Sequence, residues 1–407
     1  MLGWEFPPYF AGGVGIVCYE LTKALAMKGH EITYLMPSGP QNVGSEHVRL
    51  LVADNYITDA QITIKKVPSL MTAYGTMEDY LRQRALLLKN PDAAKNSLSK
   101  LYGANLLLEM QRFAAKVKEM IPLLDFDVIH AHDWTTFPAA MALKELTGKP
   151  LIVHVHITEF DKTGGEHADP QVYKVEQEGM KKADLVIAVS NLVKQRLIHQ
   201  YYIDPQKIRV VYNAVEFSPK PVLKEDFALS KNDKVVLFLG RVTLQKGPDY
   251  FVEAARKVID IMPNVKFIMA GKGDMLNRMI EKVASMGLSE KFIFPGFVSR
   301  AEGDKLYRMA DVFVMPSVSE PFGIVPLEAM YQDTPVIISR QSGISEVLQN
   351  CLKVDFWDVN DIANKILASL SYGVMHRTLL ENGREEIMSF NWSKPADKII
   401  DLYKELT

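Results

Sequence analysis

Two carboxylates bracket a predicted helix start in the segment 319–330, Ser-Glu-Pro-Phe-Gly-Ile-Val-Pro-Leu-Glu-Ala-Met. Pro326 is typical of the first turn of a helix, so the amides of residues 323–325 would be free to point at a phosphate group. Glu320 lies in the loop before this turn and Glu328 lies within it. The pattern predicts an anion site flanked by two carboxylates. In the alternative, Glu328 only complements the helix dipole and Glu320 only caps the turn.

Two cations follow another predicted strand, in the segment Gly240-Arg241-Val-Thr-Leu-Gln-Lys246-Gly247. In a doubly wound sheet, ligands bind beyond the carboxyl ends of the strands. Arg241 and Lys246 at such an end suit a diphosphate. Taken by themselves they would also suit a solvent-exposed basic loop.

Gly12, Gly13 and Gly15 open a helix predicted over 14–27. Bare amides at this helix start could face an anion or a sugar hydroxyl, although the spacing does not match a dinucleotide fingerprint. The alternative is a plain tight turn between a strand and a helix.

Histidines end two predicted strands. The first carries His130, His132 and then Asp133, and the second carries His154 and His156. Alternation along a strand turns each His-x-His pair to one face. A metal site is conceivable, but we take neither cysteine to lie near the histidines and do not favour it. We expect Asp133 and His156 to orient a substrate; a purely structural His-Asp hydrogen bond is the alternative.

Short apolar runs alternate with helical patterns along the chain, which predicts an α/β fold of parallel sheets. A polar segment over 215–233 predicts a linker between two domains. Residues 54–120 are expected to form an insertion, with helical patterning over 78–88 and 98–120. Residues 392–406 predict a final helix. Met1 and Leu2 alone precede the first turn, which predicts a frayed edge or a chain lacking a few residues. Asp125 and Asp127 precede a strand, so we interpret them as solvated. The strand-like runs are 31–36, 48–53, 127–132, 151–156, 185–190, 208–214, 234–240, 265–271, 292–297, 312–317 and 335–340.

Composition excludes several classes of protein. Lys plus Arg number 47 and Asp plus Glu 49, a formal net charge of -2, which argues against nucleic acid or polybasic membrane binding. Cys18 and Cys351 are the only cysteines, which is typical of a reducing compartment. No apolar run predicts an integral membrane segment, and no signal peptide is evident, so we expect a cytoplasmic protein.

These motifs together resemble the retaining GT-B glycosyltransferases of family 4, close to their glycogen and starch synthase relatives. The resemblance covers nearly the whole chain, and its most specific parts are Gly-Arg…Lys-Gly at 240–247 and the paired glutamates at 320 and 328. It implies two Rossmann-like doubly wound domains facing a central cleft. The acceptor domain would span 1–215, the nucleotide-sugar domain 216–388, and a helix over 389–407 would cross back.

The resemblance also implies residue roles. Arg241 and Lys246 would offset charge on the departing diphosphate, Glu328 would hold the ribose, and Glu320 would contact the transferred sugar. His156 is similar to a family histidine that contacts the donor sugar, and Asp133 to an active-site aspartate of glycogen synthases. The full implied donor-binding set is Gly12, Gly13, Gly15, Gly240, Arg241, Lys246, Gly271, Phe297, Val298, Glu320, Gly323, Ile324, Val325 and Glu328.

The expected activity is metal-independent, retaining transfer of a hexose to an α-glucan, with glucose from UDP- or ADP-glucose as the expected hexose. No cofactor is expected. Starch and bacterial glycogen synthases carry a Lys ahead of the glycine loop, where this chain has Phe10 and Ala11. Alternatives are a lipid, cell-surface glycan or small-molecule acceptor, a nucleotide-sugar epimerase, and a non-catalytic nucleotide-sugar or glycan-binding module.

Overall fold

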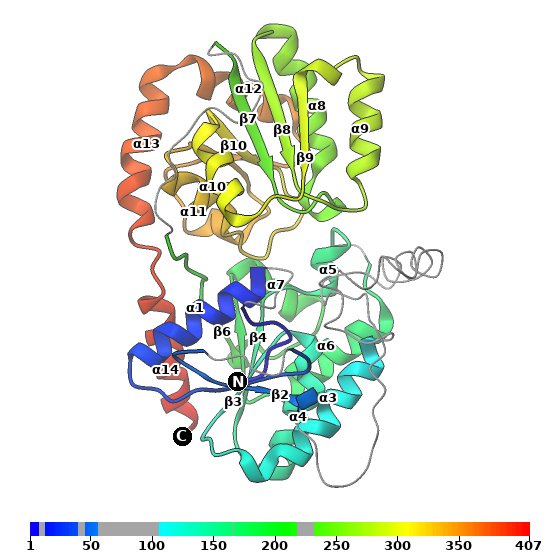
Figure 1. Cartoon of the computed structure of the whole chain (residues 1–407), viewed down its shortest axis with the longest axis vertical. Coiled ribbons are helices and arrows are strands. Elements are labelled where there is room, and N and C mark those ends of the chain that lie inside the picture. Colours follow the sequence, from blue (N-terminus) through cyan, green and yellow to red (C-terminus); the bar gives the residue numbers. More distant parts are fainter. Residues whose placement is uncertain (8–12, 40–44, 56–105, 166, 218–231) are drawn as a thin grey trace.

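A computed structural model describes residues 1–7, 13–39, 45–55, 106–165, 167–217 and 232–407 (Figure 1). Gly12, Phe10 and Ala11, the helical pattern over 78–88 and most of the predicted insertion and linker lie outside the described residues. Two α/β units follow one another along the chain, each built on a parallel sheet. The prediction of an α/β fold is therefore confirmed.

The first sheet holds the histidine motifs. Strands β3 to β6 pair in parallel in chain order, and β1 pairs with β2. Each predicted run in this half contains a strand, but the strands are shorter than the runs. Their bounds are β1 (Thr33–Met36), β2 (Arg49–Val52), β3 (Ile129–His132), β4 (Leu151–Val155), β5 (Leu185–Ala188) and β6 (Ile208–Val210).

Leu2 joins these two groups of strands. It forms parallel bridges to both Leu35 and Ala131, and its amide donates to the carbonyl of His130 at 2.8 Å. The side chain is 1% exposed. The prediction of a frayed edge is thus wrong, because Leu2 lies between β1 and β3. Hydrogen bonds to both strands hold this short segment in the sheet.

Helices cover both faces of the first sheet. Apolar side chains of α1 and the final helix α14 pack on one face with Ile152 and Ile187, and α3, α4 and α6 pack on the other with Ala131 and Val153. Since His130, His132 and His154 alternate with the latter set, they lie on the face beneath α1 and α14. The helices are α1 (Gly13–Met27), α3 (Leu106–Met120), α4 (Phe137–Thr147), α5 (Glu159–Lys162), α6 (Pro170–Lys182) and α7 (Asn191–His199).

The second sheet has the strand order β12-β11-β10-β7-β8-β9. Its edge strand β12 has only three residues and was not predicted. The elements are β7 (Lys234–Leu239), α8 (Pro248–Ile261), β8 (Val265–Ala270), α9 (Leu276–Ser285), β9 (Phe292–Gly296), α10 (Arg300–Met309), β10 (Val312–Met315), α11 (Val325–Tyr331), β11 (Val336–Ser339), β12 (Leu352–Val354), α12 (Val359–Ser371), α13 (Gly373–Ile387) and α14 (Ser393–Leu406).

The chain crosses back to the first unit at its end. Helix α13 runs beside the second sheet and α14 beside the first (Figure 1). Ile399 of α14 is fully buried, and the Tyr403 hydroxyl lies 2.7 Å from Nδ1 of His130. The final helix therefore packs against the first unit, while the predicted division into domains and its boundaries stay predictions.

Candidate active site

The carboxyl ends of β7 and β8 approach each other more closely than side chains would permit. A Cβ on Gly271 would lie 1.8 Å from the carbonyl oxygen of Gly240, and φ of Gly271 is 140°. Only glycine fits there without a shift of the backbone. The backbone is thus closely packed at the edge of the second sheet that faces the first unit, where the amides of Gly240 and Gly271 donate to the carbonyls of Ala270 and Gly296.

Lys246 and Glu320 form an ion pair at this edge. Lys246 ends a short 3-10 turn over Leu244–Lys246, and Glu320 lies in the loop after β10. The Ser317 hydroxyl donates to the same carboxylate at 3.4 Å. The side chains are 16% exposed for the lysine and 9% for the glutamate. The structure therefore brings together a cation and a carboxylate that are distant in the sequence.

Arg241 lies on the open side of the same edge. Its side chain is exposed, and Nη2 donates to Oε1 of Gln245 at 3.2 Å. Gln245 is 2% exposed, and its backbone carbonyl accepts from the amide of Val318 at 2.9 Å. Gln245 therefore ties the basic loop to the loop that carries Glu320.

Glu328 lies in the first turn of α11, as predicted. The hydroxyl of buried Tyr307 donates to its Oε2 at 3.2 Å. Burial raises the pKa of the Glu328 carboxyl, and the Arg300 guanidinium and the Tyr307 hydroxyl oppose this shift. Burial also raises the pKa of Tyr307, so its hydroxyl stays protonated and can hold the carboxylate in place.

The other predicted donor-binding residues differ in exposure. Gly323, at φ 93°, and Ile324 and Val325 are partly buried beside Glu320, while Phe297 is 71% exposed after β9 and Val298 is partly buried. Gly13 is exposed and Gly15 buried at the start of α1. Their roles toward a ligand stay predictions.

The two histidines of β3, His154 of β4 and His156 directly after β4 form one buried stack. His130 Nε2 lies 3.3 Å from His154 Nδ1, and His132 Nδ1 lies 3.0 Å from His156 Nε2. Burial lowers the pKa of His156 to about 3. It also lowers the pKa values of the other three well below their usual range, and neighbouring histidines add to this effect. All four imidazoles are therefore neutral at physiological pH.

Asp133 holds the end of β4. Its Oδ1 accepts from the amide of His156 at 2.7 Å and from that of Ile157 at 3.3 Å. Asp133 has φ 58°, an unusual conformation for a residue with a side chain. Its carboxylate therefore fixes the position of His156 through the backbone, and its role toward a substrate stays a prediction.

Cys18 lies close to two of the histidines. Its thiol on α1 and a nitrogen each of His132 and His156 lie within 4.8 Å of one another. The prediction that neither cysteine lies near the histidines is wrong, because the packing of α1 on the sheet closes a gap that spans more than a hundred residues of sequence. Burial raises the pKa of the Cys18 thiol to about 12.

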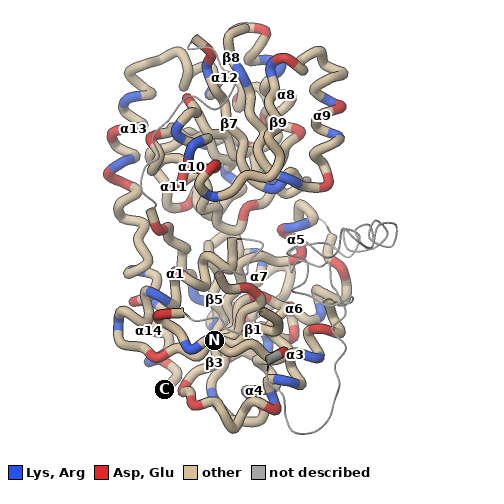
Figure 2. Tube along the Cα trace, in the orientation of Figure 1, with Lys and Arg blue, Asp and Glu red and all other residues tan. Residues whose placement is uncertain are grey.

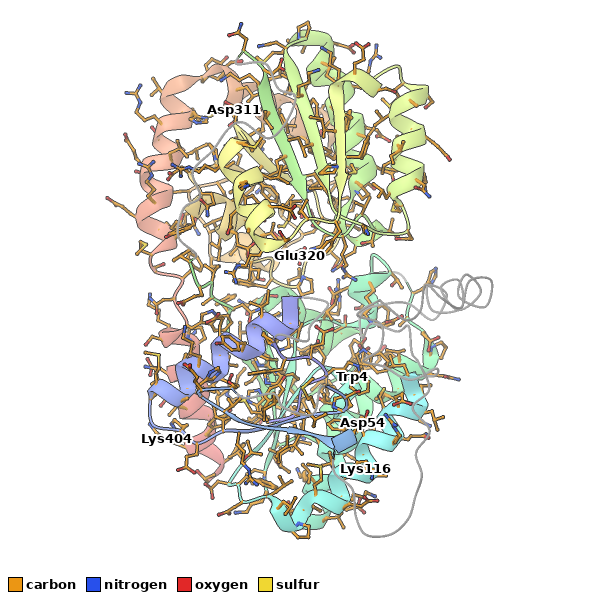
Figure 3. The ribbon with its side chains drawn as sticks, viewed as in Figure 1. Trp4, Asp54, Lys116, Asp311, Glu320 and Lys404 are labelled. Atoms are coloured by element: carbon orange, nitrogen blue, oxygen red, sulfur yellow. The ribbon has the colours of Figure 1, made fainter. Side chains whose placement is uncertain are left out.

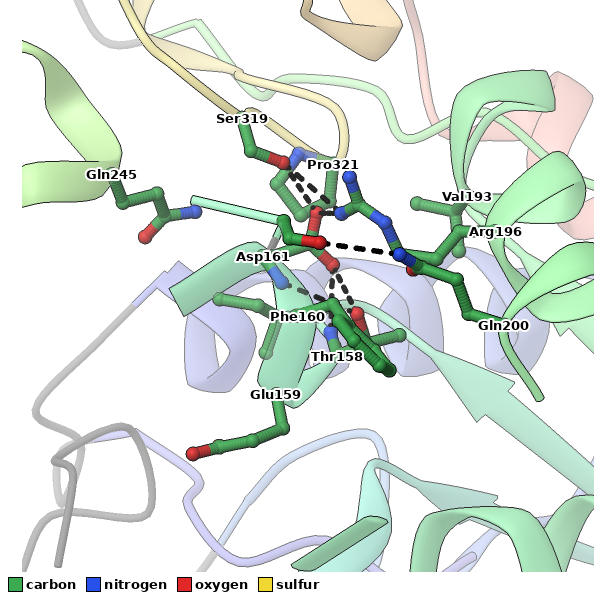
Figure 4. A network of polar contacts seen from close by, with 12 residues as sticks. Thr158, Glu159, Phe160, Asp161, Val193, Arg196, Gln200, Gln245, Ser319 and Pro321 are labelled. Atoms are coloured by element: carbon green, nitrogen blue, oxygen red, sulfur yellow. Dashed lines mark hydrogen bonds and ion pairs between the residues drawn. The ribbon is translucent and has the colours of Figure 1, made fainter. Parts of the chain in front are cut away.

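A polar network joins the two units next to Glu320 (Figure 4). Ser319 Oγ donates to Oδ1 of Asp161 at 2.7 Å, and Arg196 donates to Ser319 Oγ at 3.0 Å and pairs with the same aspartate. Asp161 is fully buried and also accepts from the amide of Thr158 at 2.8 Å. The first unit thus fixes the loop that carries Glu320, whose place between the units Figure 3 shows.

Sequence reasoning missed several of these residues. Gln245 and Ser319 lie inside the recognised motifs, and their polar side chains were a usable signal. Tyr307, Asp161 and Arg196 lie outside the motifs, and their partners are distant in sequence. No local pattern could have indicated them.

The arrangement can bind and stabilise a polyanion. A lysine and an arginine lie at one sheet edge, in the loop that follows β7. Fixed charges in a partly buried site stabilise developing negative charge strongly. Over the described residues, both signs of charge are interspersed (Figure 2), so this local cation pair does not belong to a general basic surface.

Two sequence families match this chain. The model described as "Glycosyltransferase Family 4" matches residues 11–218, and "Glycosyl transferases group 1" matches residues 219–386. The chain belongs to glycosyltransferase family 4. The prediction of a hexosyltransferase enzyme is confirmed, and the non-catalytic alternative is set aside.

Relatives and solved structures extend this family assignment. An uncharacterized glycosyltransferase of Methanocaldococcus jannaschii is 26% identical over 99% of this chain and 97% of its own length. An Escherichia coli galactosyltransferase acting on α-D-GlcNAc-diphosphoundecaprenol is 29% identical over 91% and 95%. A Mycobacterium tuberculosis glycogen synthase is 25% identical over 99% and 93%.

Two solved structures show the fold. Sucrose-phosphate synthase of Thermosynechococcus elongatus has a TM-score of 0.72 at 23% identity over 97% of this chain and 94% of its own. HepE of Anabaena, in complex with UDP and glucose, has a TM-score of 0.67 at 18% identity over 100% and 98%. The predicted GT-B fold is therefore confirmed. Among the described helices, none is both long and apolar enough to cross a membrane.

Proposed function

We propose that this glycosyltransferase moves a hexose from a nucleotide-sugar to an α-glucan with retention of the anomeric configuration. The observation that carries the proposal is the partly buried Lys246–Glu320 pair at the carboxyl edge of the second sheet, near Arg241. The UDP and glucose bound in the HepE structure support a UDP-linked donor. Similarity to a glycogen synthase over nearly the full chain supports the acceptor.

We expect the donor to separate the Lys246–Glu320 ion pair and to bind both of its side chains. In the structure the Lys246 ammonium contacts the Glu320 carboxylate. On donor binding, the diphosphate takes over Lys246 and Arg241, and Glu320 turns to the hydroxyls of the sugar. Departure of the nucleoside diphosphate leaves negative charge on phosphate, which the two cations stabilise. This step uses residues of the chain and no metal ion.

The first unit supplies the facing wall. His156 at the end of β4 would contact the donor sugar, and Asp133 would hold its backbone in place. We expect the acceptor hydroxyl to attack from the face that the diphosphate leaves, because a same-face attack retains configuration. No residue is assigned as a covalent nucleophile.

A panel of UDP-, ADP- and GDP-sugars tests the proposal, with glycogen, maltooligosaccharides or a lipid extract as acceptor. We expect glycogen-dependent release of nucleoside diphosphate from UDP- or ADP-glucose. Lys246→Ala should lower the rate by a factor of about 100 or more. Lys234→Ala is the matched control, because Lys234 pairs with Asp311 and lies at the amino end of β7, away from the proposed site. Equal rates for both variants would refute the diphosphate role.

A lipid-linked acceptor is the second candidate. The E. coli relative acts on a diphosphoundecaprenol-linked sugar, by its name, and is similar over most of both chains. Release of nucleoside diphosphate that requires the lipid extract and not glycogen would favour this acceptor.

A further inference from the structure

A hollow on the surface of the second unit lies between helix α8 and the start of helix α12. Its volume is about 450 Å³, within the range of about 300–1,000 Å³ that small-ligand sites occupy. None of the residues that line it belongs to the candidate active site. The lining includes the side chains of Arg256, Lys257, Asp260, Trp357, Asp358 and Asn360.

Trp357 presents an aromatic ring to solvent in this hollow. It is 57% exposed, whereas the other three tryptophans of the chain, Trp4, Trp134 and Trp392, are 4%, 3% and 6% exposed. A ligand that covers the indole ring removes a large apolar area from water, which is favourable. The ring therefore offers a flat apolar surface for binding.

Neighbouring groups hold the Trp357 ring in place. It meets the Phe356 ring edge to face, with centroids 4.8 Å apart, and the Phe356 ring lies 5.2 Å from that of Tyr250 on α8. The amide of Asp358 donates to the carbonyl of Asp355 at 3.0 Å, which fixes the turn that carries the tryptophan. Little conformational entropy is therefore lost when a ligand packs on this ring.

The polar groups around the ring suit a neutral ligand with many hydroxyl groups better than an anion. Nε of Arg256 lies 3.2 Å from Oδ1 of Asp260, so its positive charge is already paired. The ammonium of Lys257 and the side-chain amide of Asn360 are exposed in the same hollow. Hydroxyl groups can donate to carboxylates and accept from ammonium and amide groups. A phosphate would instead be repelled by the carboxylates of Asp260 and Asp358.

A row of aromatic rings leads from the hollow to the loop that carries Lys246. Tyr250 lies in the first turn of α8, directly after that loop, and a Cβ on Gly247 would lie 3.2 Å from the Tyr250 ring. The rings of Tyr250, Phe356 and Trp357 follow one another from there to the hollow. A polymer bound at the hollow is thus held on the unit that carries the proposed diphosphate site.

We propose that the hollow around Trp357 binds glucose units of an α-glucan, outside the site where transfer takes place. The indole face covers the C–H face of a pyranose ring, and the side chains of Lys257, Asp260 and Asn360 bind its hydroxyls. The inference rests on the proposed function for its ligand, because the acceptor proposed there is a polymer of such rings. Attachment at a second point raises the effective concentration of acceptor ends at the first.

Tryptophan fluorescence of the full chain tests this site, since Trp357 alone of the four tryptophans is exposed. In the absence of donor, glycogen or maltoheptaose should change the emission and protect the indole from quenching by iodide. Both effects should be lost in Trp357→Ala. Asn360→Ala, which keeps the ring, should lower the affinity by a factor of about three to ten. Tyr372→Ala is the matched control, because Tyr372 is 66% exposed on the same unit and does not line the hollow.

Two results would overturn the site. One is iodide quenching that saturating glycogen leaves unchanged in the wild type. The other is an equal affinity of the wild type and Trp357→Ala for glycogen, measured by affinity electrophoresis. Circular dichroism checks that the variant folds, as an exposed position predicts. Should Trp357→Ala fail to fold, an affinity of Asn360→Ala equal to that of the wild type would overturn the site instead.

Kinetics separate this inference from the proposed function. Trp357→Ala should raise the KM for glycogen by a factor of about five or more and change the KM for maltotriose, a short acceptor, by less than about twofold. Glucan binding that requires Trp357 in a protein that transfers nothing to glycogen would leave the hollow standing and refute the proposed acceptor. Transfer to glycogen with an unchanged KM and affinity in Trp357→Ala would leave the proposed function standing and refute the hollow as a glucan site.

Discussion

Under the proposed mechanism, Glu320 pairs first with Lys246 and then with the donor sugar, so its substitution should change both donor binding and transfer. Glu320→Gln removes the negative charge that pairs with the Lys246 ammonium. We expect UDP to bind several-fold more tightly, because its diphosphate no longer competes with a carboxylate. The transfer rate should fall by a factor of about 100, since a positioned carboxylate near the sugar is lost. Calorimetric titration with UDP and initial rates measure the two effects; weaker UDP binding would contradict the competition.

The buried carboxyl of Glu176 predicts how the stability of the first unit depends on pH, separately from catalysis. Its Oε1 accepts from the amide of Glu159 at 2.9 Å and its Oε2 accepts from the Tyr201 hydroxyl. Burial raises the pKa of the Glu176 carboxyl to about 8, above its usual 4.5. Between these values the folded state binds more protons than the unfolded state, so this carboxyl's contribution to stability is lost as pH rises.

Glu176→Gln cannot lose a proton, so its stability should gain on the wild type as pH increases. We expect the difference in free energy of unfolding to grow by about 1.4 kcal/mol per pH unit between pH 5 and 8. Urea unfolding of both proteins across this range measures it. A difference that does not change with pH would show that the Glu176 carboxyl is not protonated in the folded state.

At the scale of elements, the contact between α7 and the second unit can be tested separately. The Glu346 carboxylate accepts from the amides of Asn191 and Leu192 at 2.9 and 2.7 Å, and so caps a helix of the other unit. Glu386 makes the same kind of bonds to the amides of Gln349 and Asn350 within its own unit. The two glutamates form a matched pair.

Glu346→Ala should cost about 0.5–2 kcal/mol of stability, as the loss of a helix cap does. Glu386→Ala, which leaves two amides outside a helix without their acceptor, should cost about 1–3 kcal/mol. Only Glu346→Ala should also raise the KM for the donor, because it loosens the two units around the site. Steady-state kinetics and urea unfolding check both statements. An equal rise of KM in both variants would contradict the role of the inter-unit contact.

The elements also show how far sequence reasoning reaches. Strands such as β7 and β10 were predictable because buried parallel strands are short apolar runs. Loop residues at their carboxyl ends followed from the fold rule that ligands bind there. The bridging place of Leu2 and the nearness of Cys18 to His132 were not predictable, because both depend on pairing between distant segments.

The whole molecule is held together by its last helix as well as by the site. Ile399 of α14 is fully buried against α1, whereas Ile261 at the end of α8 is 69% exposed. Ile399→Ala should lower the free energy of unfolding by about 2–5 kcal/mol, and Ile261→Ala should change it by less than about 0.5 kcal/mol. Thermal or urea unfolding of both variants makes the comparison. Similar stabilities would show that α14 adds little to the first unit.

Transfer of labelled glucose is the most direct test of the central claim. Purified protein would be incubated in EDTA with radiolabelled UDP-glucose or ADP-glucose and glycogen, and the label in the precipitated polymer would be measured. We expect label in the polymer that α-glucosidase releases, and about 100-fold less with Lys246→Ala. If the polymer carries no label with UDP-glucose and none with ADP-glucose, while the protein is folded and binds UDP, the result would contradict an α-glucan-extending transferase.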